Sequence, residues 1–172
     1  MKTFKNLLSV LAIAAVFSAG AYAQQDVQVS AIVQSTLAFS AVNNVTFGVI
    51  TQNTEAVQGA NGNTSLTPAN NTNASSGSVT VTGNAGVSIA ISYNTGVQLS
   101  DGTNTVDFTP EVMVGSTTIA QSGTNVTLSG TTGLGTALVE IGGTLDAIAT
   151  AGTYSTTSGT PITLTVAYNI MI

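Results

Sequence analysis

The side chains that could do acid–base or nucleophilic chemistry in this 172-residue chain are mainly carboxylates, hydroxyls and tyrosines. The chain has no His, Cys, Arg or Trp, and its two lysines lie at the N-terminus. Glycoside hydrolysis needs two carboxylates that converge on one bond. The nearest pairs, Asp101 with Asp107 and Asp107 with Glu111, lie in turn-rich sequence where solvated acids are expected. We therefore predict no catalytic residues and no enzymatic activity. The acidic residues are Asp26, Glu55, Asp101, Asp107, Glu111, Glu140 and Asp146.

One stretch carries oxygen ligands at a spacing that could suit Ca²⁺. Asp101, Asn104 and Asp107 fall within seven residues, but the stretch lacks the bidentate Glu and the regular spacing of a calcium loop. A Gly102 turn with solvated acids is the favoured interpretation, which leaves these three residues as weak calcium candidates. Zinc and iron sites lack their usual His and Cys ligands. We predict no bound metal and no cofactor.

Charge restricts the partners of the chain. Charged residues make up 5% of the sequence, against about 25% in ordinary soluble domains. The formal net charge is −5, and it becomes −7 without Lys2 and Lys5. Binding to nucleic acid needs cations that displace counterions from phosphates, and adhesion to anionic lipid needs cations too. The expected partners are therefore the chain itself, other surface subunits or a glycan, and not nucleic acid.

The N-terminus has the pattern of an export signal. Lys2 and Lys5 precede an apolar run over 7–17, and Ala21-Tyr22-Ala23 is the small-x-small pattern expected before cleavage. The apolar run is shorter than the about 20 residues of a transmembrane helix. We predict a cleaved signal peptide over 1–23 and a mature chain over 24–172 without a membrane span. That chain would reach the periplasm, the cell surface or the medium through a Sec-type route.

The last stretch of the chain alternates strictly between apolar and smaller or more polar residues. A period of two is the β-strand period, and the stretch over 162–172 exceeds the usual strand of about five or six residues. Burial of each large apolar side chain contributes about 1.5–3 kcal/mol, so this side of the strand must face a core. The predicted core or assembly strand carries Ile162, Leu164, Val166, Tyr168 and Ile170.

Similar alternation recurs along the whole chain, and no stretch after the signal has a sustained helical period. A first strand is predicted over 27–39, with Val27, Val29 and Val33 on one side. The segments 78–82 and 87–93 are separated by four residues, which is a hairpin signature. Further strands are predicted over 45–50, 97–100, 106–114, 117–120, 125–128, 136–141, 144–148 and 161–172.

The pattern predicts one all-β domain, an antiparallel sandwich or barrel. Residues 51–77 differ in composition, being rich in Asn, Thr, Gly and Ser. We interpret 51–77 as a mobile polar surface loop, with short ordered pieces near Ala56-Val57 and over 65–67, and a binding loop is the alternative.

Five short motifs occur in a characteristic order. They are Val45-Thr46-Phe47-Gly48-Val49-Ile50, Ser78-Val79-Thr80-Val81-Thr82-Gly83, Ile141-Gly142-Gly143-Thr144-Leu145, Ala151-Gly152-Thr153-Tyr154 and Leu164-Thr165-Val166-Ala167-Tyr168-Asn169.

In order and spacing these motifs resemble domain-of-unknown-function family 4402, a family of small exported bacterial proteins. The resemblance covers nearly all of the mature chain. It implies an immunoglobulin-like, pilin-like antiparallel β-sandwich related to fimbrial subunits and spore-coat-U-like proteins. Two features depart from chaperone–usher pilins, which usually have a disulfide and a penultimate aromatic residue. This chain has no Cys, and Met171 stands at the penultimate position, although Gly159 occupies the usual glycine position.

The favoured function is an exported structural surface protein, either a pilin-like subunit or a matrix component. The last strand could close the sandwich by itself, or the segment with Val27, Val29 and Val33 could be donated to the open edge of a neighbouring copy. Self-closure is slightly favoured. The alternative function is a glycan-binding or adhesin module that uses residues 51–77 and the rings of Tyr93, Tyr154 and Tyr168, although core or corner positions are the favoured interpretation of those rings.

Overall fold

The computed structural model describes residues 33–62, 64–65, 73–131 and 133–169. The chain divides into Met1–Val33 and Gln34–Ile172, and the fold below is that of the second unit. Its described residues form strands and no helix. The predicted signal peptide and residues 27–32 of the predicted first strand lie outside the described residues. The strands are β1 (Ala38–Asn43), β2 (Ala56–Gln58), β3 (Thr64–Ser65), β4 (Gly77–Asn84), β5 (Ser88–Tyr93), β6 (Gln98–Ser100), β7 (Thr105–Val114), β8 (Thr117–Thr118), β9 (Thr124–Thr127), β10 (Leu134–Leu145), β11 (Ser155–Thr160) and β12 (Leu164–Tyr168).

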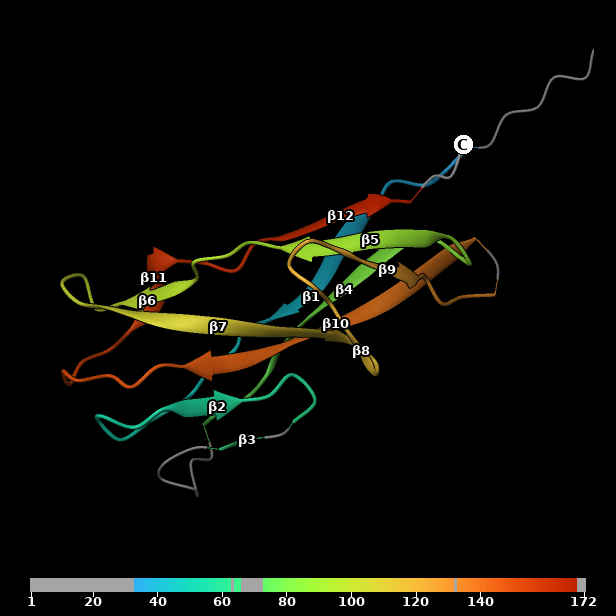
Figure 1. The fold of residues 1–172 in the computed structure, drawn as a ribbon. Helices are drawn as coiled ribbons and strands as arrows, with labels where there is room; N and C mark the ends of the chain where they lie inside the picture. The colour runs from blue at the N-terminus through green and yellow to red at the C-terminus, as the bar shows by residue number, and fades with distance from the viewer. Residues whose placement is uncertain (1–32, 63, 66–72, 132, 170–172) are drawn as a thin grey trace, which may run out of the picture. The chain divides into compact units, whose positions relative to one another are not determined.

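The strands form two sheets in which all the pairings are antiparallel. The larger sheet has the order β1-β4-β10-β7-β6-β11, with β2, β3 and β8 paired beside this path. The smaller sheet has the order β12-β5-β9. Figure 1 shows β12 and β5 as a layer next to the layer that contains β10 and β7. The all-β prediction is confirmed, and the arrangement is consistent with a β-sandwich.

A first apolar core lies where the two sheets face each other. Val81 from β4 and Val139 from β10 are fully buried against Ile89 and Ile91 from β5. These residues alternate with exposed or half-buried ones, because successive side chains of a strand leave opposite faces of the sheet. The predicted inward face of 87–93 is therefore correct.

A second apolar core lies beneath β6, β7 and the end of β10. The rings of Phe47 and Phe108 meet edge to face with their centroids 5.8 Å apart, a favoured geometry for aromatic pairs. Val97, Val106 and Leu145 complete this cluster.

Three sequence predictions about local structure are wrong. The first strand among the described residues begins at Ala38, and residues 33–37 form no strand. Residues 45–50 form only an isolated bridge between Thr46 and Ser75, because Gly48 has a φ of 61° that interrupts an extended strand. The last strand ends at Tyr168 among the described residues, and β11 was not predicted at all.

The predicted hairpin of 78–82 with 87–93 is also wrong. β4 pairs with β1 and β10, whereas β5 pairs with β12 and β9. The turn at Ala85-Gly86 therefore carries the chain from one sheet to the other. Two strands with apolar inner faces can pack face to face across a core as well as pair side by side, and the alternation is the same in both cases.

The described part of the polar region 51–77 contains strands and buried residues. β2 pairs with the end of β10, and Ala56, Gln58 and Ala60 are buried. The predicted ordered pieces correspond approximately to β2 and β3. Residues 66–72 lie outside the described residues.

Candidate functional site

The predicted calcium candidates lie in a turn that uses its own oxygen atoms. Asp101 Oδ1 accepts hydrogen bonds from the backbone N–H groups of Thr103 (2.9 Å) and Asn104 (2.7 Å), and Oδ2 accepts one from the Asn104 side-chain amide (2.9 Å). These bonds, the Asn104 side-chain bond first, lower the pKa of Asp101 to about 2. Asn104 thus presents nitrogen and not oxygen to Asp101. Hydrogen bonds within the turn therefore hold the carboxylate.

Of the carboxylate pairs considered for glycoside hydrolysis, Asp107 and Glu111 do not converge. Asp107 and Glu111 lie on one face of β7, and four residues of extended chain separate them by about 13 Å, beyond the about 5–9.5 Å of glycosidases. Asp107 accepts a hydrogen bond from the Gln98 amide (2.7 Å), and Glu111 accepts one from the Ala60 N–H (2.9 Å). Among the described residues, no group of three or more acidic side chains could hold a metal ion.

The three tyrosines singled out in the sequence contact the cores. Tyr93 packs against the first core, and burial raises its pKa. Tyr154 packs against the second core and its hydroxyl donates to the Thr150 carbonyl (3.2 Å). Burial raises the pKa of Tyr154, and the charge on Asp101 raises it further. These contacts favour core and corner positions for both rings over exposed sugar-stacking positions.

The outer side of β12 is an edge of the smaller sheet among the described strands. This strand pairs with β5 from Leu164–Tyr93 to Tyr168–Ile89, and no described strand pairs with its other side. On the β5 side, the Thr163 carbonyl accepts a hydrogen bond from the Asn94 N–H, and the Asn169 N–H donates one to the Ser88 carbonyl. Because backbone groups alternate in direction along a strand, those of Leu164, Val166 and Tyr168 face the open side.

The side chains of the same three residues face the first core and are half-buried. The alternation predicted for the last strand is therefore observed over 164–168, with Thr165 and Ala167 exposed. Ile162 is half-buried against the second core. Ile170 lies outside the described residues.

The free side of β1 forms the other border of this opening. Phe39 is opposite Val81, which is fully buried, so the Phe39 ring is on the inner side of the sheet. It nevertheless remains 45% exposed, because β1 is an edge strand. Sequence analysis placed Phe39 within a strand but did not identify it as an exposed edge residue.

The Tyr168 hydroxyl links the end of β12 to the chain just before β1 and to the end of β4. Its hydroxyl donates to the Ser35 carbonyl (2.8 Å) and accepts from the Asn84 N–H (2.9 Å), and the Ser35 N–H donates to Asn84 Oδ1 (2.9 Å). In Figure 1 the start of β1 accordingly lies beside the end of β12. We call the free sides of β1 and β12, with Phe39, Leu164 and Val166, the open edge.

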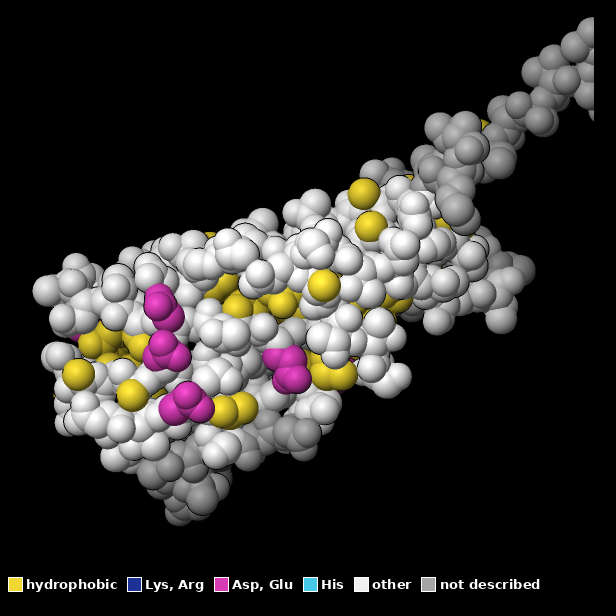
Figure 2. Space-filling model, in the orientation of Figure 1, with side chains coloured by type: hydrophobic (Ala, Val, Ile, Leu, Met, Phe, Trp, Pro, Cys, Tyr) yellow, Lys and Arg dark blue, Asp and Glu magenta, His cyan; other side chains and the backbone are white. Residues whose placement is uncertain are grey.

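The open edge is electrically neutral, since neither β1 nor β12 contains a charged residue. Figure 2 shows scattered acidic side chains on the visible face and no basic side chain. Unpaired N–H and C=O groups beside apolar side chains are the surface that accepts an added β-strand.

Comparison with models of protein families, with curated proteins and with solved structures finds no match to this chain. The resemblance to family 4402 therefore stays a prediction. Among the described residues, no helix has the length and apolar character needed to cross a bilayer.

Proposed function

We propose that this protein is an exported, non-catalytic structural subunit that assembles outside the cell by strand addition at the open edge. The single observation that carries this proposal is the unpaired side of β12, whose three inward side chains are only half-buried. A neighbour's strand would satisfy the backbone groups of Leu164, Val166 and Tyr168 and would cover Phe39.

The strand order supports an immunoglobulin-like origin of this opening. Such sandwiches have one sheet in the order ABED and a second sheet with strands C, F and G. β1-β4-β10-β7 follows the first order, and β12 and β5 occupy the F and C positions of the second. The missing element would be strand G, beyond β12.

The predicted donor is the segment that begins at the mature N-terminus. It alternates through Val27, Val29, Ala31 and Val33, which suits a strand with one apolar side. Ten extended residues span about 33 Å, whereas the five residues of β12 span about 17 Å. Val33 is 88% exposed and residues 33–37 form no strand, which favours donation to another copy over self-closure. The rest of the donor lies outside the described residues.

A deletion of Gln24–Gln34 tests this assembly. We expect the secreted chain to form assemblies in electron micrographs and in sedimentation. The deletion variant would keep the acceptor edge and lose the donor, so it would remain monomeric. A synthetic peptide of residues 24–34 would then raise its melting temperature by several degrees, because a ligand at about 100 times its Kd adds about 2.7 kcal/mol of stability.

The control is a peptide of the same length in which Val27, Val29 and Val33 are replaced by Ser. It should leave the melting temperature of the deletion variant unchanged. Assembly of the deletion variant to the same extent as the full secreted chain would contradict strand donation. A monomeric full chain whose stability falls on deletion would instead support self-closure.

A further inference from the structure

On the side of β10 away from β4, one backbone pairing position has no partner strand among the described residues. The Thr136 backbone bonds with Ser129 in both directions (2.8 and 2.9 Å), and Glu140 pairs with Met113. Leu138 lies midway, and its N–H and C=O face the same side as those of Thr136. β7 ends at Val114 and turns into β8, so no described strand reaches Leu138 there.

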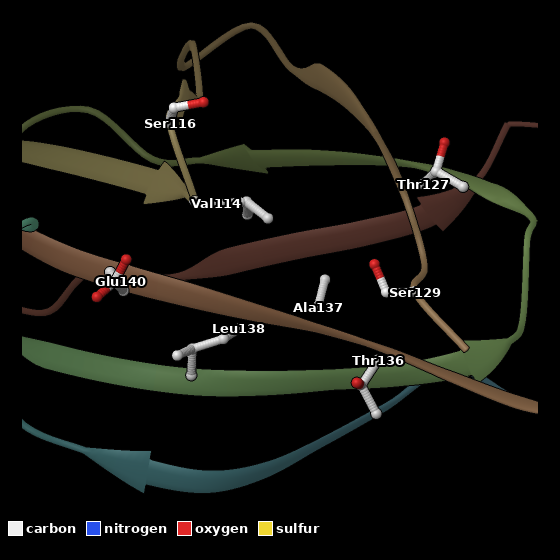
Figure 3. A pocket seen from close by; sticks show the side chains of 9 residues that line it. Val114, Ser116, Thr127, Ser129, Thr136, Ala137, Leu138 and Glu140 are labelled. Atoms are coloured by element: carbon white, nitrogen blue, oxygen red, sulfur yellow. The ribbon is translucent and has the colours of Figure 1, made fainter. Parts of the chain in front are cut away.

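An open-sided cavity of about 570 Å³ lies at this gap, and its volume falls within the about 300–1,000 Å³ of small-molecule sites. Figure 3 shows its three walls: Val114 and Ser116 from the β7–β8 hairpin, Thr127 and Ser129 from β9 and the chain after it, and part of β10. Ala137 leaves β10 on the side opposite to its neighbours Thr136 and Leu138, and Leu138 is 52% exposed. The lining residues are Val114, Gly115, Ser116, Thr127, Ser129, Thr136, Ala137, Leu138 and Glu140.

The length of the gap argues against an extended peptide as its occupant. Thr136 and Glu140 are about 13 Å apart along β10, and chain at Ser129 and Met113 closes both ends of the gap. A peptide could pair with Leu138 alone and would have to enter and leave out of the plane of the sheet. Strand addition normally uses a row of main-chain bonds. A compact ligand suits the gap better.

The lining chemistry identifies the class of ligand. The walls contain no cation, so phosphates and carboxylates would find no charge partner. Four hydroxyl side chains and the Leu138 N–H and C=O can each pair with a group that both donates and accepts. Glu140 can only accept when ionised, and it would accept from ligand hydroxyls. Leu138, which is 52% exposed, and the partly buried Val114 offer an apolar surface to ring C–H groups. Sugar hydroxyls and ring faces have this combination.

We propose that this cavity, the β10 gap, is a binding site for a neutral carbohydrate. The site differs from the one suggested by residues 51–77 and the tyrosines. It lies within one copy of the chain and does not rest on the proposed assembly. Copies that assemble would display many such sites, so that weak individual binding becomes multivalent.

Saturation-transfer NMR on the full secreted chain tests the proposal, because it detects weak ligands and tolerates large assemblies. The probes are the methyl glycosides of glucose, galactose, mannose and N-acetylglucosamine at concentrations around the millimolar Kd expected of so small a site. We expect saturation transfer to at least one glycoside. Glu140→Gln should weaken its binding by about fivefold or more, since hydrogen bonds to a charged acceptor are roughly twice as strong as neutral ones.

Matched variants separate the β10 gap from the rest of the surface. Ser116→Trp should fill the cavity and abolish binding, whereas Ser122→Trp places the same side chain in another exposed turn and should not. Glu55→Gln is the control for Glu140→Gln, since Glu55 is exposed and outside the cavity. Thermal melts would verify that each variant is folded. Absence of transfer to all four glycosides, or binding that survives both cavity variants, would overturn the proposal.

Discussion

Gly142 and Gly143, near the end of β10, let two strands approach β10 at very short range. A Cβ on Gly142 would lie 2.2 Å from the backbone of Gln58 and Ala60, and one on Gly143 would lie 2.2 Å from the Thr109 carbonyl. Both contacts are with backbone, which cannot move aside as a flexible side chain can. The paired glycines therefore allow β2 and β7 to flank β10 at one position.

Gly142→Ala should destabilise the fold by about 1–3 kcal/mol, the usual cost of overpacking a well-packed core. Urea unfolding followed by circular dichroism would measure this loss. Gly152→Ala is the matched control, because its Cβ would meet nothing closer than 3.4 Å. The control should be neutral or slightly stabilising, since Ala restricts the unfolded chain. Equal stability of the two variants would contradict the close packing at β10.

Acid should open the Asp101 turn at a lower pH than that of an ordinary aspartate. The folded pKa is about 2, below the ordinary value of 3.8. A lowered pKa means that ionised Asp101 stabilises the fold above about pH 3.8, and that this contribution disappears as the pH falls through about 2. The amide shifts of Thr103 and Asn104 should titrate with a midpoint near 2. A midpoint near 4 would mean that the turn does not hold the carboxylate.

At the scale of elements, β12 combines two roles that depend on its alternation. Its inward side chains cover Ile89 and Ile91, while no described strand pairs with its outer backbone groups. An edge strand with an apolar inner side and no charge is a liability for a secreted monomer, because it can pair with other chains. The same properties are what an assembling subunit needs.

Val166→Asp should prevent folding or reduce stability by at least about 2 kcal/mol, because it places a carboxylate opposite fully buried Ile91 with no cation in the described chain. Thr165→Asp is the control on the neighbouring, exposed position and should change stability by less than about 0.5 kcal/mol. Thermal melts of the two variants would measure this difference in stability. A melting temperature for Val166→Asp equal to that of the unchanged protein would contradict the placement of the β12 side chains against the first core.

At the scale of the whole molecule, electrostatics contributes repulsion and no ion pairs within the described residues. The described acids are Glu55, Asp101, Asp107, Glu111, Glu140 and Asp146, and no Lys, Arg or His accompanies them. Stability must therefore come from the two apolar cores and the sheet hydrogen bonds, since disulfides are absent as well.

Added sodium chloride should raise the melting temperature slightly and never lower it. Screening shortens the Debye length from about 30 Å at 0.01 M to about 8 Å at 0.15 M, and here it can only weaken repulsion between like charges. Differential scanning calorimetry at both concentrations measures the effect. A fall in melting temperature would indicate a stabilising attraction that the described residues do not contain.

The open edge could be predicted from sequence only in part. The alternation at Leu164, Val166 and Tyr168 gave the correct inner face of β12, because a period of two is a local property. The exposure of Phe39 was not predictable, because it depends on whether another strand lies next to β1. The β10 gap was not predicted either, since it requires the ends of β7 and β9 to stop on either side of Leu138.

The sequence by itself determined the all-β class, the near absence of charge, the lack of His and Cys as ligands for zinc or iron and for disulfides, and the position of most strands after residue 77. Composition and alternation are sufficient for these properties because they act within a few residues. Only the tertiary structure decided that β4 and β5 belong to different sheets, that the pair Gly142-Gly143 lies inside one long strand, and that β12 and β1 are edges. These outcomes depend on which strands meet across large sequence separations, and many pairings share one and the same alternating pattern.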